Sequence, residues 1–177
     1  MAHSTARNYI RLSSSPQMSD GTDGVFSTVD LSAFVDPLHS LAFHIVSADI
    51  QITQDAAPYG LLDSVTVTGG TAIGMQLATG TNTSMLRPSD GKVIFHKYAL
   101  YVNETGTQGM ASWTEESFNV KVLWPEGYIA VIDTLTAMAQ CTADLAATVR
   151  MTYTLTGYQR KVNANQLASL LVAQTQG

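Results

Sequence analysis

The spacing of the apolar residues constrains this chain more than any other feature: from residue 25 onward the period is two, not 3.6. In the last repeat of this kind, Val149, Met151, Tyr153 and Leu155 alternate with threonines and an arginine. Successive side chains of a strand point to opposite faces, so this alternation predicts half-buried strands. Threonine fills many outward positions, as suits a pleated, partly exposed surface. The chain is therefore predicted to be all-β.

Eight segments carry the strand pattern, and turns that contain glycine or proline separate them. We predict strands near 25–35, 41–54, 64–68, 73–78, 92–102, 117–124, 128–139 and 146–158. Many short strands at this spacing favour a two-sheet sandwich or a barrel. Eight is the number in a jelly roll. We expect an eight-stranded, jelly-roll-like β-sandwich with an extended N-terminal arm and a short C-terminal helix or tail.

The stretch 41–54 changes parity part of the way along. Its apolar residues occupy odd positions as far as Ile45, and even positions from Val46 to Ile52. A β-bulge inserts one extra residue into a strand and produces this shift. We therefore predict one long strand with a bulge at this point.

The closing strands are expected to supply much of the core. Residues 128–139 are apolar on both faces, as in a strand at the centre of a sandwich. The stretches on either side alternate cleanly. We predict that seven of their side chains point into one core: Phe118, Val120, Val122, Val149, Met151, Tyr153 and Leu155.

The chain divides into three parts by composition. Residues 1–24 are rich in serine, threonine and glycine and are expected to form an arm; residues 25–162 form the sandwich domain. Residues 163–177 form a tail with leucines at helical spacing. This tail is too short to be a stable helix alone in water, so it needs a surface to lie on.

Both ends are predicted to contact neighbouring subunits rather than to build the fold. The candidate assembly contacts are the large apolar residues of the arm and the tail: Tyr9, Ile10, Leu12, Leu167, Leu170 and Leu171. Segments with so few apolar residues are ordered by an additional surface. We favour an adjacent subunit over a membrane, because no positive charge follows Lys161.

The charge balance argues against nucleic acid as a direct partner. Nine basic residues stand against fourteen acidic ones, a net charge of -5, and only Arg160 and Lys161 are adjacent basic residues. Nucleic-acid binding depends on clustered positive charge, so sequence-specific contact is not expected. Only 13% of the residues are charged. Copies with such a surface repel one another weakly, which suits self-association.

The sequence offers no constellation for catalysis, metal binding or a cofactor, and we expect none. Cys141 is the single cysteine, and no Gly-x-Ser-x-Gly elbow occurs. The adjacent Glu115 and Glu116 would point to opposite faces of a strand. Asn82 and Asn103 begin glycosylation sequons, which we expect to be unused because the N-terminus resembles no secretory signal.

The stretch from 117 to 162 reads SFNVKVLWPEGYIAVIDTLTAMAQCTADLAATVRMTYTLTGYQRKV. It resembles the closing half of a single jelly-roll capsid protein of tailless icosahedral viruses of bacteria and archaea. The resemblance implies a structural role in a virion after synthesis in the host cytoplasm, with copies of itself and other capsid proteins as partners and no catalytic residues. A basic arm is missing, which favours a shell around an internal membrane or around DNA packed by other means.

Two hypotheses of function follow. The first is a capsid subunit that assembles with itself or with other capsid proteins into a shell. The alternative is a carbohydrate- or receptor-binding sandwich of a fibre or adhesin, for which Tyr59, Tyr101 and Trp113 are the candidate exposed aromatic residues.

Overall fold

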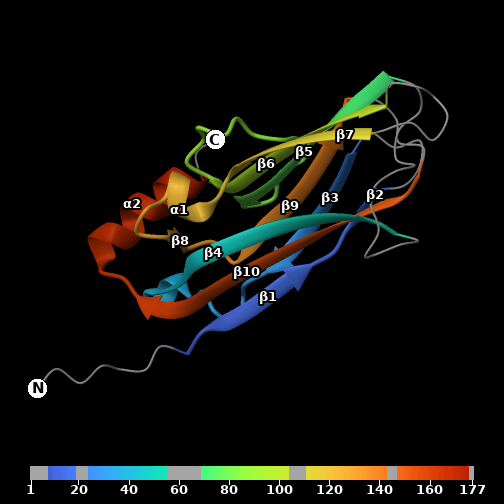
Figure 1. Cartoon of the computed structure of the whole chain (residues 1–177). Helices are drawn as coiled ribbons and strands as arrows, with labels where there is room; N and C mark the ends of the chain where they lie inside the picture. The colour runs from blue at the N-terminus through green and yellow to red at the C-terminus, as the bar shows by residue number, and fades with distance from the viewer. Residues whose placement is uncertain (1–7, 19–23, 56–68, 104–110, 143–146, 176–177) are drawn as a thin grey trace, which may run out of the picture.

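The computed structural model contains two five-stranded antiparallel sheets packed face to face (Figure 1). It describes residues 8–18, 24–55, 69–103, 111–142 and 147–175. The elements are β1 (Ile10–Ser14), β2 (Gln17–Met18), β3 (Gly24–Asp30), η1 (Pro37–His39), β4 (Leu41–Gln54), β5 (Gly69–Thr79), β6 (Val93–Asn103), β7 (Ala111–Phe118), α1 (Val120–Leu123), β8 (Tyr128–Ala130), β9 (Thr134–Cys141), β10 (Val149–Lys161) and α2 (Ala164–Thr175).

The order of the strands is that of a jelly roll. Sheet A runs β1-β10-β4-β8, with β2 also paired to β10, and sheet B runs β3-β9-β5-β6-β7. With β2 and β7 set aside, sheet A holds the first, eighth, third and sixth strands of the chain, and sheet B holds the second, seventh, fourth and fifth. Two nested Greek keys give this order. The predicted all-β jelly-roll-like sandwich is confirmed.

The predicted bulge lies where β4 pairs with β10. Leu155 faces Ala48 and Thr156 faces Ser47, but the next residue of β10, Gly157, faces Ile45, so Val46 is the extra residue. A side chain at Gly157 could not fit, because its Cβ would lie 2.5 Å from the carbonyl oxygen of His44. The glycine therefore allows the two strands to stay paired across the bulge.

The buried core lies between the sheets, and the polar ends of its largest side chains bind the opposite sheet. Tyr153 of sheet A is fully buried, and its hydroxyl donates to the carbonyl oxygen of Met138 in sheet B at 2.5 Å. From sheet B, the Lys97 ammonium donates to the Ile50 carbonyl oxygen in sheet A at 3.0 Å. Buried polar groups cost little when they are paired in this way.

A third tie joins β8 to the end of β5. The Tyr128 hydroxyl lies 3.2 Å from the Thr79 hydroxyl and donates to the Gly91 carbonyl oxygen at 3.1 Å. Burial raises the pKa of Tyr128 to about 12, so the hydroxyl keeps its proton at any physiological pH.

The prediction of a strand over 117–124 is wrong after Phe118, where β7 ends. The Asn119 side chain accepts hydrogen bonds from the backbone N–H groups of Lys121 and Val122 and begins the single turn α1. Val120 is buried as predicted, but Val122 is 61% exposed, and Phe118 lies on the outer face of sheet B beside His96. In so short a stretch, a strand and a single helical turn can have the same spacing of apolar residues. The Asn119 cap favours the helical turn.

The single strand predicted over 128–139 is two strands in different sheets. β8 pairs with β4 in sheet A, and β9 pairs with β3 and β5 in sheet B. Both strands are buried on two sides, so the apolar sequence continues where the chain passes from sheet A to sheet B. The sequence pattern therefore gives no sign of the change of sheet. The inward placement predicted for the alternating residues of β10 is confirmed.

The range expected to form an arm contains two strands. β1 pairs with β10 along its whole length, and Met18 of β2 is fully buried. The described part of this range therefore belongs to the sandwich. The strand predicted at 64–68 lies outside the described residues.

Gly157→Ala should destabilise the protein by about 1–3 kcal/mol, because the added methyl group must displace the backbone of β4 or the ring of Phe43. Thermal unfolding followed by circular dichroism measures the change. Gly91→Ala is the matched control, because a Cβ there meets nothing within 4 Å. Equal melting temperatures for Gly157→Ala and the parent would show that the bulge does not need its glycine.

Candidate interaction surfaces

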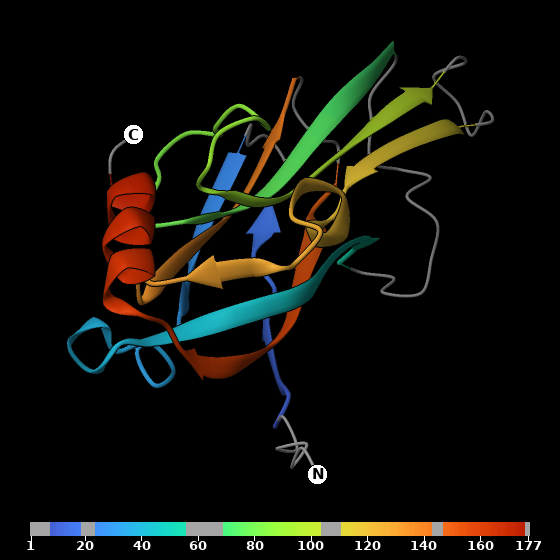
Figure 2. The same cartoon turned by 90° about the vertical axis from the view of Figure 1, so that its left-hand side faces the viewer.

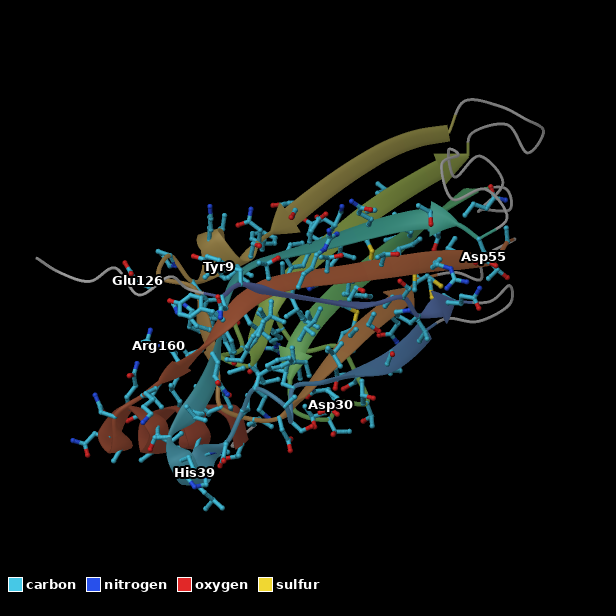
Figure 3. All side chains as sticks on the ribbon, turned by 90° about the horizontal axis from the view of Figure 1, so that it is seen from below. Tyr9, Asp30, His39, Asp55, Glu126 and Arg160 are labelled. Atoms are coloured by element: carbon cyan, nitrogen blue, oxygen red, sulfur yellow. The ribbon has the colours of Figure 1, made fainter. Side chains whose placement is uncertain are left out.

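The three candidate contacts near the N-terminus lie on sheet A. Ile10 and Leu12 of β1 pack against the core, so their apolar surface is largely taken up within the chain. Tyr9 is 57% exposed and meets Tyr158 edge to face, with ring centroids 5.6 Å apart. Figure 3 shows Tyr9 over the same end of the molecule as Arg160. Contact between Tyr9 and a neighbouring subunit stays a prediction.

The three leucines of the tail face the chain's own sandwich. Leu167, Leu170 and Leu171 pack against a small buried cluster on the outer face of sheet A: Ala42, Val131 and Val162. Asn163 caps the helix by accepting from the backbone N–H of Gln166 at 2.8 Å. The surface that this short helix needs is therefore provided by its own chain, and the face left for a neighbour is the opposite one.

A buried amide fixes the far end of α2. The Gln174 side chain is 3% exposed; its Oε1 accepts from the Val131 N–H at 3.1 Å, and its Nε2 donates to the Ile129 carbonyl oxygen at 2.7 Å. These are the backbone groups at the end of β8, the short edge strand of sheet A. The amide thus bonds this edge as another strand would.

The solvent face of α2 carries no charge. Asn165, Ala168, Ser169 and Val172 are exposed at helical spacing, and Val172 is 52% exposed. Residues 162–177 contain no Asp, Glu, Lys, Arg or His. A surface helix normally places charged residues on its exposed side, so this face is unusual for one that meets only water.

A loop beside α2 that is closed by hydrogen bonds exposes a leucine. Leu38 of η1 is 93% exposed. The Asp36 carboxylate accepts from the backbone N–H of His39 at 3.3 Å and lies 2.5 Å from the His39 ring nitrogen, and this hydrogen bond lowers the pKa of Asp36. Asp36 also forms a two-way backbone bridge with Leu41, which closes the loop at its base.

This loop and α2 form one continuous end of the molecule. The Val162 N–H, just before α2, donates to the Ser40 carbonyl oxygen, just after η1, at 3.0 Å. Figures 2 and 3 place the loop beside the start of α2 in both views. We call the exposed set Leu38, Asn165, Ala168, Ser169 and Val172 the end surface.

The outer face of sheet B is partly covered by residues 80–92, the connection between β5 and β6. Gln76 is fully buried beneath it: its Oε1 accepts from the Leu86 N–H and its Nε2 donates to the Leu86 carbonyl oxygen, both at 2.9 Å. Met85 covers Gly74 on the same face. On the neighbouring strand, His96 Nδ1 lies 3.2 Å from Gln76 Nε2.

A cavity of about 260 Å³ opens between the middle of β4 and α1. Its lining residues are Ser47, Ala48, Asp49, Phe95, Ser117, Asn119, Val120 and Lys121. It is slightly smaller than most ligand pockets, which enclose roughly 300–1,000 Å³. Within the described ranges, no group of three or more His, Cys, Asp or Glu is arranged to hold a metal ion.

The remaining sequence candidates lie on sheet B, in the segment 80–92 that covers it, or outside the described residues. Tyr59 lies outside the described residues, and Tyr101 and Trp113 are opposite each other in the β6–β7 ladder. The Glu116 carboxylate accepts a hydrogen bond from the Tyr98 hydroxyl. The Asn82 side chain amide donates to the Thr79 carbonyl oxygen at 2.9 Å, within the chain. None of the helices in the described ranges is long and apolar enough to cross a membrane.

No protein-family model and no curated protein matches the sequence. Among solved structures, a turnip yellow mosaic virus chain matches with 11% identity and a TM-score of 0.35 over 90% of this chain and 99% of that one. The decameric BFDV capsid protein matches with 12% identity and a TM-score of 0.17 over 88% and 100%. The tailspike protein of Acinetobacter baumannii phage AM24 matches with 9% identity and a TM-score of 0.17 over 85% and 27%. These scores identify no family for the chain.

Gln174→Ala should loosen α2 from sheet A, because it leaves the Val131 N–H and the Ile129 carbonyl oxygen without their partner. We expect a loss of about 1–3 kcal/mol, measured by urea unfolding. Val172→Ala, on the opposite side of the helix, should cost less than about 0.5 kcal/mol. Equal losses for the two variants would contradict the anchoring role of Gln174.

Proposed function

We propose that this chain is a structural subunit of a virion shell and that the end surface is one of its contacts with further copies of itself. The observation that carries the proposal is an exposed, uncharged helix face beside a hydrogen-bonded loop whose leucine is 93% exposed. Gln174 and the Asp36–Leu41 bridge hold these two parts in place. A surface fixed in advance loses little entropy on binding.

The charge distribution favours a second copy as the occupant. The whole chain carries a net charge of -5, so two copies repel each other weakly where their charged surfaces meet. The exposed face of α2 carries no charge, and the Asp36 carboxylate beside Leu38 is hydrogen-bonded to the His39 ring of its own chain. The end surface can therefore meet the same surface of another copy with little like-charge repulsion. A surface that pairs with itself must be complementary to itself, as in a two-fold contact.

The size of the end surface indicates a weak contact. A helix of 12 residues is about 18 Å long and about 10 Å wide, so its exposed side offers roughly 200 Å². Stable complexes bury about 800 Å² on each partner. A pair joined here alone would dissociate in dilute solution. Shell assembly suits such contacts, because several weak contacts per subunit act together once the shell closes.

The test is assembly of Val172→Glu, which places a charge in the middle of the end surface. Sedimentation velocity and light scattering over a concentration series should show large particles for the parent and little above the subunit mass for the variant. Leu38→Asp should act in the same direction. Ser13→Glu, on the exposed face of β1, is the matched control and should assemble normally.

A charge-swap experiment tests whether the contact joins like surfaces. Val172→Glu and Val172→Lys should each fail to assemble alone, and an equal mixture should recover assembly because the opposite charges meet across the contact. Normal assembly of both single variants with an unchanged melting temperature would remove the end surface from the proposal. A parent protein that stays monomeric at every concentration would contradict self-assembly itself.

A further inference from the structure

We propose that Gln76 and His96 form a proton-sensitive latch: with the His96 ring neutral, the Gln76 amide holds residues 80–92 against the outer face of sheet B, and protonation of the ring releases the middle of that segment. The latch concerns the isolated subunit and does not depend on shell assembly.

The hydrogen bonds fix the orientation of the Gln76 amide. The Leu86 N–H donates to one end of the amide, which must therefore be the oxygen; the other end is the NH₂ group, which donates to the Leu86 carbonyl oxygen. This NH₂ group is the atom that faces His96 Nδ1 at 3.2 Å. An amide NH₂ cannot accept a hydrogen bond, so Nδ1 must carry no proton.

Protonation of the ring therefore conflicts with the closed arrangement. A histidinium is a donor at both nitrogens, so an N–H on Nδ1 would point at the N–H of Gln76. Rotating the Gln76 amide by half a turn would place its oxygen against the protonated Nδ1. The same rotation would place the amide NH₂ against the Leu86 N–H and the amide oxygen against the Leu86 carbonyl oxygen, so both bonds to Leu86 would be lost. The buried site offers no third arrangement that keeps all three bonds.

The middle of the segment depends on this amide. Its start is tied to the sheet because the Gly80 N–H donates to the Thr134 carbonyl oxygen at 2.8 Å, and its end is tied through Gly91 and Lys92. Near the start, the Asn82 N–H also donates to the Thr136 hydroxyl of β9 at 3.0 Å. From residue 83 to residue 89, the hydrogen bonds that join the segment to the sheet within the described residues are the two between Gln76 and Leu86. Release should therefore free the stretch around Leu86 and leave the ends in place.

The elements that pack on this face carry several titratable groups, on β6, on β7 and on the segment itself: Tyr98, Glu116, Arg87, Asp90 and Lys92. β5 contributes none. The Glu116 carboxylate is occupied by the Tyr98 hydroxyl, whose pKa this contact raises, so Tyr98 stays neutral in acid. Burial lowers the pKa of His96 below its usual 6.5, which agrees with a ring kept neutral in the closed state.

The direction of the pH effect follows from linkage. The released ring has the ordinary pKa of 6.5 and the closed ring a lower one, so acid favours the released state. The closed segment is fully favoured above pH 6.5, and this advantage is lost as the pH falls from there through the lowered pKa. For a released pKa of 6.5, the opening equilibrium rises from pH 7.5 to pH 5.5 by a factor that reaches at most about tenfold.

Hydrogen exchange of the dissociated subunit, read by mass spectrometry, tests the latch. After correction for intrinsic exchange rates, the amides around Leu86 should open several-fold more, up to about tenfold, at pH 5.5 than at pH 7.5, while the β10 amides stay protected. His96→Gln supplies an acceptor that does not titrate, so its segment should stay protected at both pH values. His39→Gln, at an exposed histidine, is the matched control and should behave as the parent does.

Three results would overturn the latch: no pH effect on the segment, the same effect in His96→Gln, or loss of protection in β10 together with the segment. Nitrogen NMR of the parent gives a second measurement that needs no variant. It should show the His96 proton on Nε2 at neutral pH, and a proton on Nδ1 would refute the proposed geometry.

Discussion

One extra residue in β4, Val46, determines which side chains of sheet A's longest strand face the core and which face outward. Before Val46, Phe43 and Ile45 face the core; after it, Ala48 and the alternate residues that follow take over that role. Without the bulge, half of this 14-residue strand would turn its apolar residues to solvent. The same shift turns Ala42 outward, where α2 covers it. The end surface thus depends on the register of a strand that it does not contain.

Long strands twist, and this twist can change how two packed sheets lie on each other. Here polar side chains connect the two sheets through the core. Tyr153 of sheet A and Lys97 of sheet B each donate a hydrogen bond to a backbone carbonyl oxygen of the opposite sheet. A hydroxyl or ammonium group must find its partner at one distance and direction, whereas apolar contact is non-directional. These ties therefore define the relative position of the sheets more sharply than apolar packing alone.

The sequence best predicts those strands of the fold that expose one face to solvent. β4 with its bulge and β10 follow from alternation, because each has residues of opposite polarity on its two faces. β5 and β6 also fall within predicted strands in part, although Gln76 and His96 on their outer faces are buried. The crossing from β8 to β9 could not be predicted, because burial on both faces removes the contrast. The turn α1 depends on the cap at Asn119, which alternation does not register. The uncharged tail is visible in the sequence, but which side of it faces solvent depends on the cluster around Ala42.

The outer faces of both sheets carry covers that are fixed in the same way. Gln174 bonds a backbone N–H and a carbonyl oxygen of the β8 region, and Gln76 bonds both backbone groups of Leu86. A glutamine side chain ends in the same amide as the backbone, so it can pair with a segment as one more residue of a strand would. Each cover is held at a defined position by this amide in addition to its apolar contacts. The two differ in one respect: Gln174 bonds only backbone groups, which do not titrate, whereas Gln76 shares its NH₂ group with a histidine. The same anchoring device is therefore insensitive to pH on sheet A, and on sheet B it depends on a single ring nitrogen.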